Sequence, residues 1–490
     1  MKIRLTSTSF LLPNNKNWKI IEDLKNIRFA KFGDISSTLT DNKKKFDFDI
    51  VLIFLPDLID YFKPNKFDEN FEKKKITNLL KLIEKRLKSN KSNLIICLSE
   101  FLFYNSINLS KNDFFTKKIK SFFKKLLYFQ SKKFKNLYIL DLDETFSEHG
   151  YKNCFDQRNF YLFRCRLSTS GIEVTAKNLK KIINRIKSTN KKVLLVDCDN
   201  TLWGGVLAED GFENIQIGQD GLGSAFFDFQ KAIKKIKESG ILVVILSKNN
   251  REDVVKVLKE HHSMVLKYED ITAFKVNWKE KTENIKQLSK DLYLGLDSFV
   301  FWDDNPIERE KVKLNLNQVH VIEAGTDVSN WPKQLLEYEG FSKFITTKED
   351  KLKTKQYKLR EKFIENKSTF NSELNYLKSI KLKPALVKIN SSTINRATQL
   401  CQKTNQFNLR TVRYNSEQIL KLNKEDICFL VHLSDIYGDH GIVGLICLRI
   451  IDKKFIFLDT FLMSCRIIGR HVEAWILNEI KKIAKKKKNK

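Results

Sequence analysis

The sequence predicts an α/β protein with three domains, and three observations support this prediction. The chain has 490 residues, which is enough for about three domains at roughly 150 residues each. Hydrophobic residues make up 42% of the chain and charged residues 30%, so each domain can bury a core and extensive disorder is not expected. Short apolar runs alternate with lysine-rich helical patterns over most of the length, which is typical of parallel sheets.

Residues 1–150 are expected to form the first domain, a parallel α/β sheet. The expected strands are residues 49–55, 93–98 and 137–140, and the expected helices are residues 75–88 and 114–132. Ser7 and Ser9 follow the first strand, but no Gly-Asp-Ser or Gly-x-Ser-x-Gly turn presents them, so no catalytic serine is predicted. A connector at residues 151–190 is expected to contain a helix over residues 172–188.

The most specific motif opens the middle domain, expected over residues 191–345. An apolar run of strand length, residues 193–196, delivers Asp197 and Asp199 to its carboxyl end, the edge at which open parallel sheets bind ligands. Two carboxylates in this position suit phosphoryl transfer. The first attacks phosphorus to form an aspartyl phosphate. The second protonates the leaving oxygen and later activates water or another acceptor.

Three further segments complete this candidate site. A strand over residues 241–246 ends in Ser247, whose hydroxyl group can bind a phosphate oxygen, and Lys281 begins a helix from which its ammonium group can neutralise a phosphate. A third strand, residues 298–302, ends in Asp303 and Asp304. Carboxylate oxygens are the ligands that Mg²⁺ prefers. The sequence therefore predicts a magnesium site formed by Asp197, Asp199, Asp303 and Asp304.

Two alternatives remain open in this region of the sequence. Lys275 could replace Lys281 as the phosphate-neutralising group. Asp141 and Asp143 repeat the Asp-x-Asp-x-Thr pattern, but Asp141 lies 247 − 141 = 106 residues before Ser247, whereas Asp197 lies 247 − 197 = 50 residues before it. We therefore expect Asp197 to be the nucleophile.

By these motifs in this order, the middle domain resembles the haloacid dehalogenase (HAD) superfamily. The resemblance implies a Rossmann-like domain, and the short spacings leave no room for a large cap. It also implies a set of site residues. These are the catalytic residues Asp197, Asp199, Ser247 and Lys281 and the phosphate-binding residues Thr201 and Asn249.

The third domain, residues 346–490, is expected to begin with a charged helix near residue 348. Strands are expected at residues 428–433, 443–448 and 455–458, followed by a helix over residues 471–482 and a basic tail. A strand, an Arg-x-x-Gly turn and a helix form an anion site, because the first N–H groups of a helix bind phosphate. This arrangement resembles the pyrophosphate loop of GNAT-type acyltransferases, which implies that the phosphopantetheine arm of an acyl carrier protein is bound by Arg466, Gly469, Arg470 and His471.

The order of the three domains is similar to that of the FkbH-like family. The matching segments are Asp197 to Val206, Asp303 to Glu310, Thr404 to Leu409 and Ser464 to Arg470. The first domain is similar in layout to that family's SGNH-hydrolase-like domain without its serine motif. The resemblance implies loading of a glyceryl unit from 1,3-bisphosphoglycerate onto an acidic acyl carrier protein, in polyketide, lipid or surface-glycan assembly.

An acyl–cysteine intermediate in this reaction would need a reactive thiol. Cys465 is the candidate, because it adjoins Arg466 and precedes a helix, and both features lower the pKa of a thiol. His440 and His471 are candidate bases for attack by the thiol. Cys198, between the two carboxylates, is expected to face the core.

Composition helps to weigh two alternative functions, nucleic-acid binding and plain phosphatase activity. The net charge is +30, which favours acidic partners. However, only 16 of the 89 basic residues are arginine, and the lysines are spread along the whole chain, so no specific nucleic-acid partner is expected. A plain Mg²⁺-dependent phosphatase of a small phosphorylated metabolite, with an accessory binding domain, is the main alternative.

No run of about 18 uncharged apolar residues occurs, so no membrane segment is expected. The eight cysteines form no Cys-x-x-Cys pair, which suits a reducing, cytoplasmic location.

Overall fold

The computed structural model describes residues 1–488 except 42, 44, 60–68, 102–114, 188–190, 342–356, 361, 365, 367–371, 405–406, 452–454 and 465–466. The chain separates into two compact units, Met1–Ser188 and Thr189–Lys490. The start of the charged helix expected near residue 348 lies outside the described residues. Across the described part of the chain, no helix has both the length and the apolar character needed to cross a bilayer.

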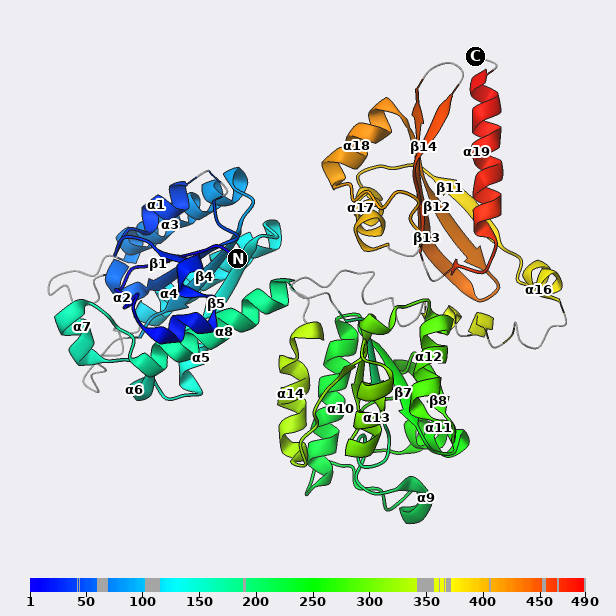
Figure 1. Cartoon of the computed structure of the whole chain (residues 1–490), viewed down its shortest axis with the longest axis horizontal. Coiled ribbons are helices and arrows are strands. Elements are labelled where there is room, and N and C mark those ends of the chain that lie inside the picture. Colours follow the sequence, from blue (N-terminus) through cyan, green and yellow to red (C-terminus); the bar gives the residue numbers. More distant parts are fainter. Residues whose placement is uncertain are drawn as a thin grey trace. The chain divides into compact units, whose positions relative to one another are not determined.

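The first unit is built on a five-stranded parallel sheet with the order β2-β1-β3-β4-β5 (Figure 1). The strands are β1 (Ile3–Ser7), β2 (Ile27–Phe29), β3 (Phe48–Phe54), β4 (Asn93–Ser99) and β5 (Leu137–Asp141). Every residue of β3 is buried because side chains from helices cover both faces of the sheet. This is why its sequence is a continuous apolar run instead of an alternating one.

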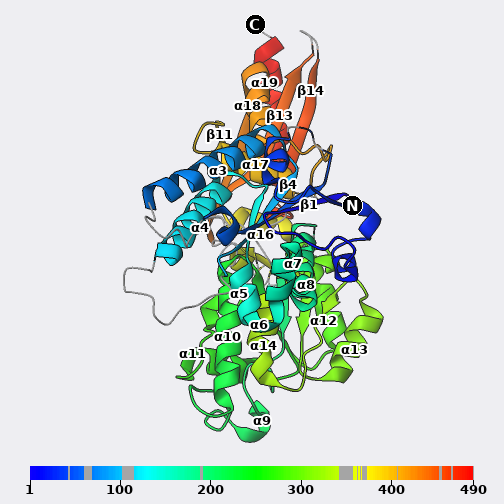
Figure 2. The same ribbon diagram turned by 90° about the vertical axis from the view of Figure 1, so that its left-hand side faces the viewer.

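Helices cover both faces of this sheet (Figures 1 and 2). They are α1 (Ile35–Thr40), α2 (Leu55–Leu58), α3 (Glu69–Ser89), α4 (Phe115–Lys133), α5 (Leu142–Ser147), α6 (Tyr151–Cys154), α7 (Gln157–Phe163) and α8 (Thr169–Lys187). Apolar residues of α1, α3 and α4 pack together on one face. On the other face, α5 and α8 share a core with β1. The segment expected to be a connector is therefore part of this unit, because α8 supplies Ile172, Leu179 and Ile183 to that core.

The second unit begins with another five-stranded parallel sheet, in the order β10-β9-β6-β7-β8. Its strands are β6 (Val193–Val196), β7 (Leu242–Ser247), β8 (Ala273–Val276), β9 (Phe299–Trp302) and β10 (His320–Val321). The α-helices around it are α9 (Leu207–Asp210), α10 (Gly223–Glu238), α11 (Arg251–Glu260), α12 (Lys281–Leu292), α13 (Pro306–Asn315) and α14 (Trp331–Glu337). Residues of α10, α11 and α14 form the core on one face, and residues of α12 and α13 form the core on the other.

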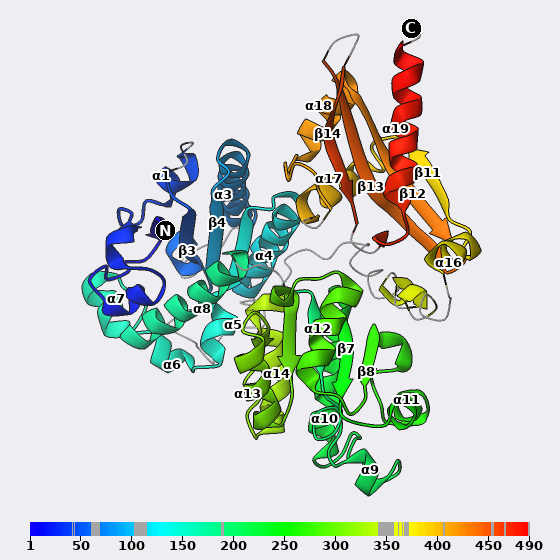
Figure 3. The ribbon, with the colours of Figure 1, turned by 45° about the vertical axis from the view of Figure 1, so that its right-hand side comes forward.

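The last part of the second unit is a four-stranded antiparallel sheet with the order β11-β12-β13-β14. Its elements are β11 (Lys383–Val387), β12 (Ile427–Asp435), β13 (Gly438–Ile450), β14 (Ile456–Met463), α16 (Glu373–Ser379), α17 (Ile394–Lys403), α18 (Ser416–Glu425) and α19 (Val472–Lys488). Figure 3 shows α17 and α18 on one face of this sheet and α19 on the other, in agreement with the two cores that they form. The strand β11 and the helices α16, α17 and α18 had not been predicted.

Short 3-10 helices join several of these elements. They are η1 (Lys16–Ile20), η2 (Leu24–Asn26), η4 (Tyr268–Asp270), η5 (Leu296–Ser298), η6 (Val328–Asn330) and η7 (Glu339–Phe341).

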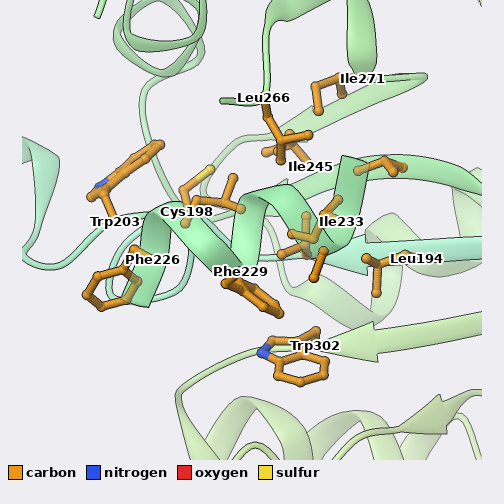
Figure 4. Close-up of a cluster of buried hydrophobic side chains, with 14 of the residues drawn as sticks. Leu194, Cys198, Trp203, Phe226, Phe229, Ile233, Ile245, Leu266, Ile271 and Trp302 are labelled. Atoms are coloured by element: carbon orange, nitrogen blue, oxygen red, sulfur yellow. The ribbon is translucent and has the colours of Figure 1, made fainter. Parts of the chain in front are cut away.

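The core beneath the middle sheet is centred on Phe229 of α10 (Figure 4). Its ring centroid lies 4.8 Å from that of Trp302, the last residue of β9, and 5.5 Å from that of Trp331 in α14. All three side chains are buried. Because Trp302 directly precedes Asp303, this aromatic packing fixes the end of the strand from which two of the predicted metal ligands follow.

We expect Phe229→Ala to lower the free energy of unfolding by about 3–5 kcal/mol, because it removes a large buried ring and leaves a cavity. Denaturant unfolding followed by tryptophan fluorescence measures this directly, since two tryptophans contact the ring. Leu222→Ala is the control, because Leu222 is 78% exposed and its loss should change stability by less than about 0.5 kcal/mol. Equal effects of the two substitutions would contradict the assignment of Phe229 to the core.

Candidate active site

The candidate site forms where three neighbouring parallel strands end. Asp197 follows β6, Ser247 ends β7, and Asp303 follows β9. β6 lies between β7 and β9 in the sheet, and the ladder continues past its end, where the Asp197 N–H donates to the Trp302 carbonyl over 3.2 Å. The three side chains are therefore brought to one edge of the sheet, the carboxyl edge at which such folds bind ligands.

Lys281 links two of these strand ends. It is the first residue of α12 and is 4% exposed. Its Nζ lies 3.0 Å from Asp197 Oδ1 and 2.5 Å from Asp303 Oδ2. Burial alone would lower the pKa of Lys281, but the negative charges of the two carboxylates outweigh it and hold that pKa above its usual value. The alternative lysine, Lys275, instead pairs with Asp291 at 2.9 Å.

Asp197, Asp303 and Asp304 form a group of three carboxylates at this edge. One oxygen from each lies within 4.8 Å of the others. Burial and the charge of Asp197 raise the pKa of both Asp303 and Asp304. One ammonium group among three carboxylates leaves an excess of negative charge, which is costly in a buried site unless a cation is bound. The donor set is all oxygen, so the residues present fit a hard divalent cation such as Mg²⁺.

Asp199 takes a different position from the other predicted metal ligands, because its carboxylate lies outside the group of three. Its Oδ1 accepts hydrogen bonds from the indole N–H of Trp203 and the backbone N–H of Leu207, each at 3.0 Å, and its Oδ2 accepts one from Asn249 at 2.9 Å. Burial raises the pKa of Asp199 despite these donors, and the charge of Asp197 adds to the effect. This carboxylate is thus held in a fixed orientation and has an increased tendency to keep a proton.

The turn after Asp199 is closed by reciprocal hydrogen bonds. The Gly205 N–H donates to Asn200 Oδ1 over 2.9 Å, and the Asn200 N–H donates to the Gly205 carbonyl over 3.2 Å. Gly205 has φ +93°, and a Cβ there would lie 2.4 Å from Asp210 Oδ2. Glycine is therefore required for this turn, which places Trp203 where its indole N–H reaches Asp199.

Thr201 and Ser247 are both buried near the carboxylates. The Thr201 hydroxyl donates to Asp304 Oδ1 over 3.1 Å and accepts from the Asp304 N–H over 3.3 Å, so it connects the ends of β6 and β9. The Ser247 hydroxyl lies beside the thiol of Cys198. Cys198 itself is buried in the core, as Figure 4 shows, and its pKa is raised well above the usual value by burial and by its two aspartate neighbours.

Two functional contacts of the α13 segment were not predicted from the sequence. The Arg309 guanidinium donates to the backbone carbonyls of Asp303 over 2.8 Å and Asp304 over 2.7 Å, which holds the loop that carries both carboxylates. Lys248, next to Ser247, pairs with Glu308 at 3.1 Å. The segment from Asp303 to Glu310 had indicated a family likeness. Its sequence did not indicate that Arg309, five and six residues after Asp304 and Asp303, would bind their backbone carbonyls.

Two of the residues predicted to act in the third domain, His440 and Arg470, share one buried carboxylate. His440 Nε2 lies 2.8 Å from Asp435 Oδ2, and Arg470 Nε lies 3.3 Å from the same oxygen. Burial opposes ionisation of Asp435, but the His440 hydrogen bond and the charge of Arg470 lower its pKa. Gly469 has φ +89°, and the exposed His471 precedes α19. Cys465 and Arg466 lie outside the described residues.

The alternative motif at the end of β5 is neutralised by lysines. Asp143 lies 2.5 Å from Lys120 Nζ and accepts from the Ser99 hydroxyl over 2.6 Å, and Asp141 lies 2.6 Å from Lys124 Nζ. Within the described residues, these aspartates are not part of a three-ligand group. Their contacts are those of helix-capping, ion-paired groups.

Fold and site together define a class of protein: a parallel α/β domain with a cluster of carboxylates and a buried lysine at the carboxyl edge of its sheet. Among solved structures, the chain is similar to the N-terminal part of the protein BF1531 from Bacteroides fragilis, which contains a phosphatase domain and was crystallised in complex with Mg. The two share 27% sequence identity, the match covers 69% of this chain and 92% of that one, and the TM-score is 0.57. No family model and no curated protein matches the chain.

We expect Mg²⁺ to stabilise the protein, because a ligand that binds the folded state raises the free energy of unfolding, by about 2.7 kcal/mol at roughly 100 times its Kd. Asp304→Asn should weaken Mg²⁺ binding by about tenfold or more while leaving the Lys281 ion pairs in place. The measurement is the shift in Tm on titrating Mg²⁺. Asp143→Asn is the matched control and should keep the full shift. An unchanged shift in Asp304→Asn would contradict the assigned ligand group.

We also expect Mg²⁺ binding to weaken as the pH falls from mildly alkaline to mildly acidic. Metal binding requires ionised carboxylates, and the raised pKa values of Asp303 and Asp304 mean that protons compete with the metal at a pH where an ordinary aspartate is ionised. Calorimetric titration at constant ionic strength gives the Kd at each pH, and its dependence on the buffer gives the protons released. A Kd that stays constant over this range would show that the sites are already fully ionised.

Proposed function

We propose that the chain is a Mg²⁺-dependent phosphatase of the HAD type. The observation that carries this proposal is the buried group of Asp197, Asp303 and Asp304 around Lys281 at the carboxyl edge of a parallel sheet. The similarity to a protein whose phosphatase domain was crystallised with Mg supports it further. The substrate class is a phosphorylated metabolite.

In the first half of the proposed reaction, a carboxylate oxygen of Asp197 attacks phosphorus and the bond from phosphorus to the leaving oxygen breaks. Asp199 gives its proton to that oxygen, a role supported by its raised pKa and fixed orientation. Lys281 offsets negative charge on the nucleophile and on the phosphoryl group. When bound, Mg²⁺ would be held by Asp197, Asp303 and Asp304 and would supply further positive charge to the phosphoryl oxygens.

In the second half, Asp199 takes a proton from water, and the water oxygen attacks phosphorus of the aspartyl phosphate. The bond to Asp197 breaks, which restores its carboxylate and releases inorganic phosphate. Thr201 and Arg309 position the two carboxylates of Asp303 and Asp304, since their hydrogen bonds hold the loop of these residues against the end of β6.

We further propose that this site serves an acyl transfer in which an acidic acyl carrier protein receives a glyceryl unit from 1,3-bisphosphoglycerate. A thiol, for which Cys465 is the candidate, attacks the acyl carbon, the bond from that carbon to the phosphate oxygen breaks, and inorganic phosphate leaves a thioester behind. The carboxylate site hydrolyses the remaining phosphate ester. The thioester then passes to the thiol of the phosphopantetheine arm. The buried His440–Asp435–Arg470 group, in which Arg470 directly follows Gly469, supports the proposal of a second reaction centre. The free thiols of the seven described cysteines suit the cytoplasmic location that this proposal includes.

The test combines the purified protein with Mg²⁺, 1,3-bisphosphoglycerate and a holo acyl carrier protein, and records phosphate release and the intact masses of both proteins. We expect Asp197→Asn to abolish hydrolysis of the phosphate ester, since it removes the nucleophile, so that the carrier gains at most a phosphoglyceryl-sized increment. We expect Cys465→Ala to abolish the mass increment on the carrier while hydrolysis of the phosphate ester continues. Asp143→Asn, in the alternative motif, is the control and should retain both activities.

Phosphate release without any increment on either protein would overturn the transferase part and leave a phosphatase. If Asp197→Asn hydrolyses the phosphate ester as fast as the wild type does, the assignment of the carboxylate site is itself wrong.

A further inference from the structure

Two arginines share one buried carboxylate on the antiparallel sheet. Asp459 in β14 is fully buried, and its Oδ1 lies 2.5 Å from Arg410 Nη1 and 3.1 Å from Arg449 Nε. Its Oδ2 accepts hydrogen bonds from the hydroxyl groups of Tyr414 and Thr460, each at 2.9 Å. The carboxylate is therefore fully bonded and holds both guanidinium groups in fixed positions.

The charge of this group is not balanced. Asp459 is the one carboxylate that pairs with Arg410 or Arg449 among the ion pairs of the described residues, so two positive charges face one negative charge. The arginine side chains are also 39% and 45% exposed. Arg449 Nη2 also donates to the Tyr414 hydroxyl over 3.4 Å, and the exposure of both side chains makes them accessible to a partner. Planar guanidinium groups bind carboxylates and phosphates in a bidentate manner.

An exposed aromatic ring packs against Arg410, and an exposed apolar side chain precedes it in the chain. The guanidinium of Arg410 lies 5.1 Å from the ring centroid of Phe457, which is 41% exposed, and the neighbouring Leu409 is 64% exposed. We call Leu409, Arg410, Arg449 and Phe457 the arginine patch. Arginine and aromatic residues are enriched at protein–protein interfaces, whereas lysine is depleted. In a chain whose basic residues are mostly lysine, this patch has the composition of an interface.

The backbone around the patch is fixed by sheet pairing. The N–H of Leu409 donates to the Phe461 carbonyl over 3.1 Å, and the N–H of Met463 donates to the Phe407 carbonyl over 3.0 Å. The segment before Arg410 is thus added to the edge of β14. On the neighbouring strand, Arg449 pairs in register with Phe457. A rigid patch loses little conformational entropy when a partner binds.

We propose that the arginine patch is the docking surface for the acidic carrier protein that the proposed function requires, and the inference rests on that function. Carboxylates on the partner would pair with the exposed N–H groups of Arg410 and Arg449, and its apolar side chains would cover Leu409 and Phe457. The net charge of +30 on the whole chain attracts such a partner over longer distances, and the patch gives it a defined place to bind.

The test measures the Kd between the full-length chain and a holo acyl carrier protein by calorimetry at two salt concentrations. We expect the double variant Arg410→Ala/Arg449→Ala to raise the Kd by about tenfold or more. Lys481→Ala/Lys482→Ala, on the exposed surface of α19, removes the same charge from the other face of the sheet and should leave the Kd within about twofold of the wild-type value.

Because the arginine substitutions leave Asp459 buried without its ion pairs, a second variant keeps those pairs intact. Leu409→Asp places a negative charge in the patch at an exposed side chain, and we expect it to raise the Kd similarly. Phosphate release by the carboxylate site verifies that every variant is folded.

An unchanged Kd in Leu409→Asp and in the double arginine variant would overturn the proposal, as would a wild-type protein that does not bind the carrier. Binding of a nucleic-acid probe that is lost in these variants, without carrier binding, would overturn it as well. In each case phosphate release tests the proposed phosphatase separately, so a failure of docking and a failure of the proposed function remain distinguishable.

Discussion

Lys281 places one ammonium group between carboxylates that the ends of β6 and β9 bring into a buried space. Parallel strands end at the same edge of a sheet, so the fold alone collects Asp197, Asp303 and Asp304 there. Without a cation, burying these groups together would be strongly unfavourable. Lys281 offsets part of this charge from the first turn of α12. Burial, together with the charge of Asp197, raises the pKa values of Asp303 and Asp304, and the excess charge that remains accounts for the affinity for a divalent cation that we infer.

Much of this site could be predicted from the sequence, because each part is encoded locally. A run of apolar residues followed by a carboxylate or hydroxyl group predicts a buried strand and a functional side chain at its end, and β6, β7 and β9 follow this pattern. The choice of Lys281 over Lys275 depends on which one begins a helix that points at the strand ends. The contact of Lys275 with Asp291 could not be foreseen, since it requires the packing of α12 beside β8.

Other features escaped prediction because they depend on pairing between distant segments. The shared oxygen of Asp435 joins His440 to Arg470. Asp459 of β14 joins Arg449 of β13 to Arg410, which lies in a segment between α17 and α18. Asp459 lies where the register between β13 and β14 shifts by one residue. Strict alternation of side chains between the two faces of a sheet cannot predict the orientation of such a residue. The extra residue of a bulge changes the face to which the following side chains point. The same limit explains why the contacts of Arg309 with the loop of Asp303 and Asp304 were not predicted. Its partners are backbone carbonyls, which every residue has, so no residue type in the sequence indicates them.

Cys198 is adjacent to the proposed nucleophile yet belongs to the hydrophobic core. Alkylating and oxidising reagents react with the thiolate form of cysteine, and burial between two aspartates suppresses that form here. Chemical labelling would thus not modify the thiol that directly follows the proposed nucleophile in the chain. Inactivation of this protein by a cysteine reagent would consequently report on a thiol elsewhere in the chain, which makes such reagents a means of testing the proposed acyl transfer without disturbing the proposed phosphate hydrolysis.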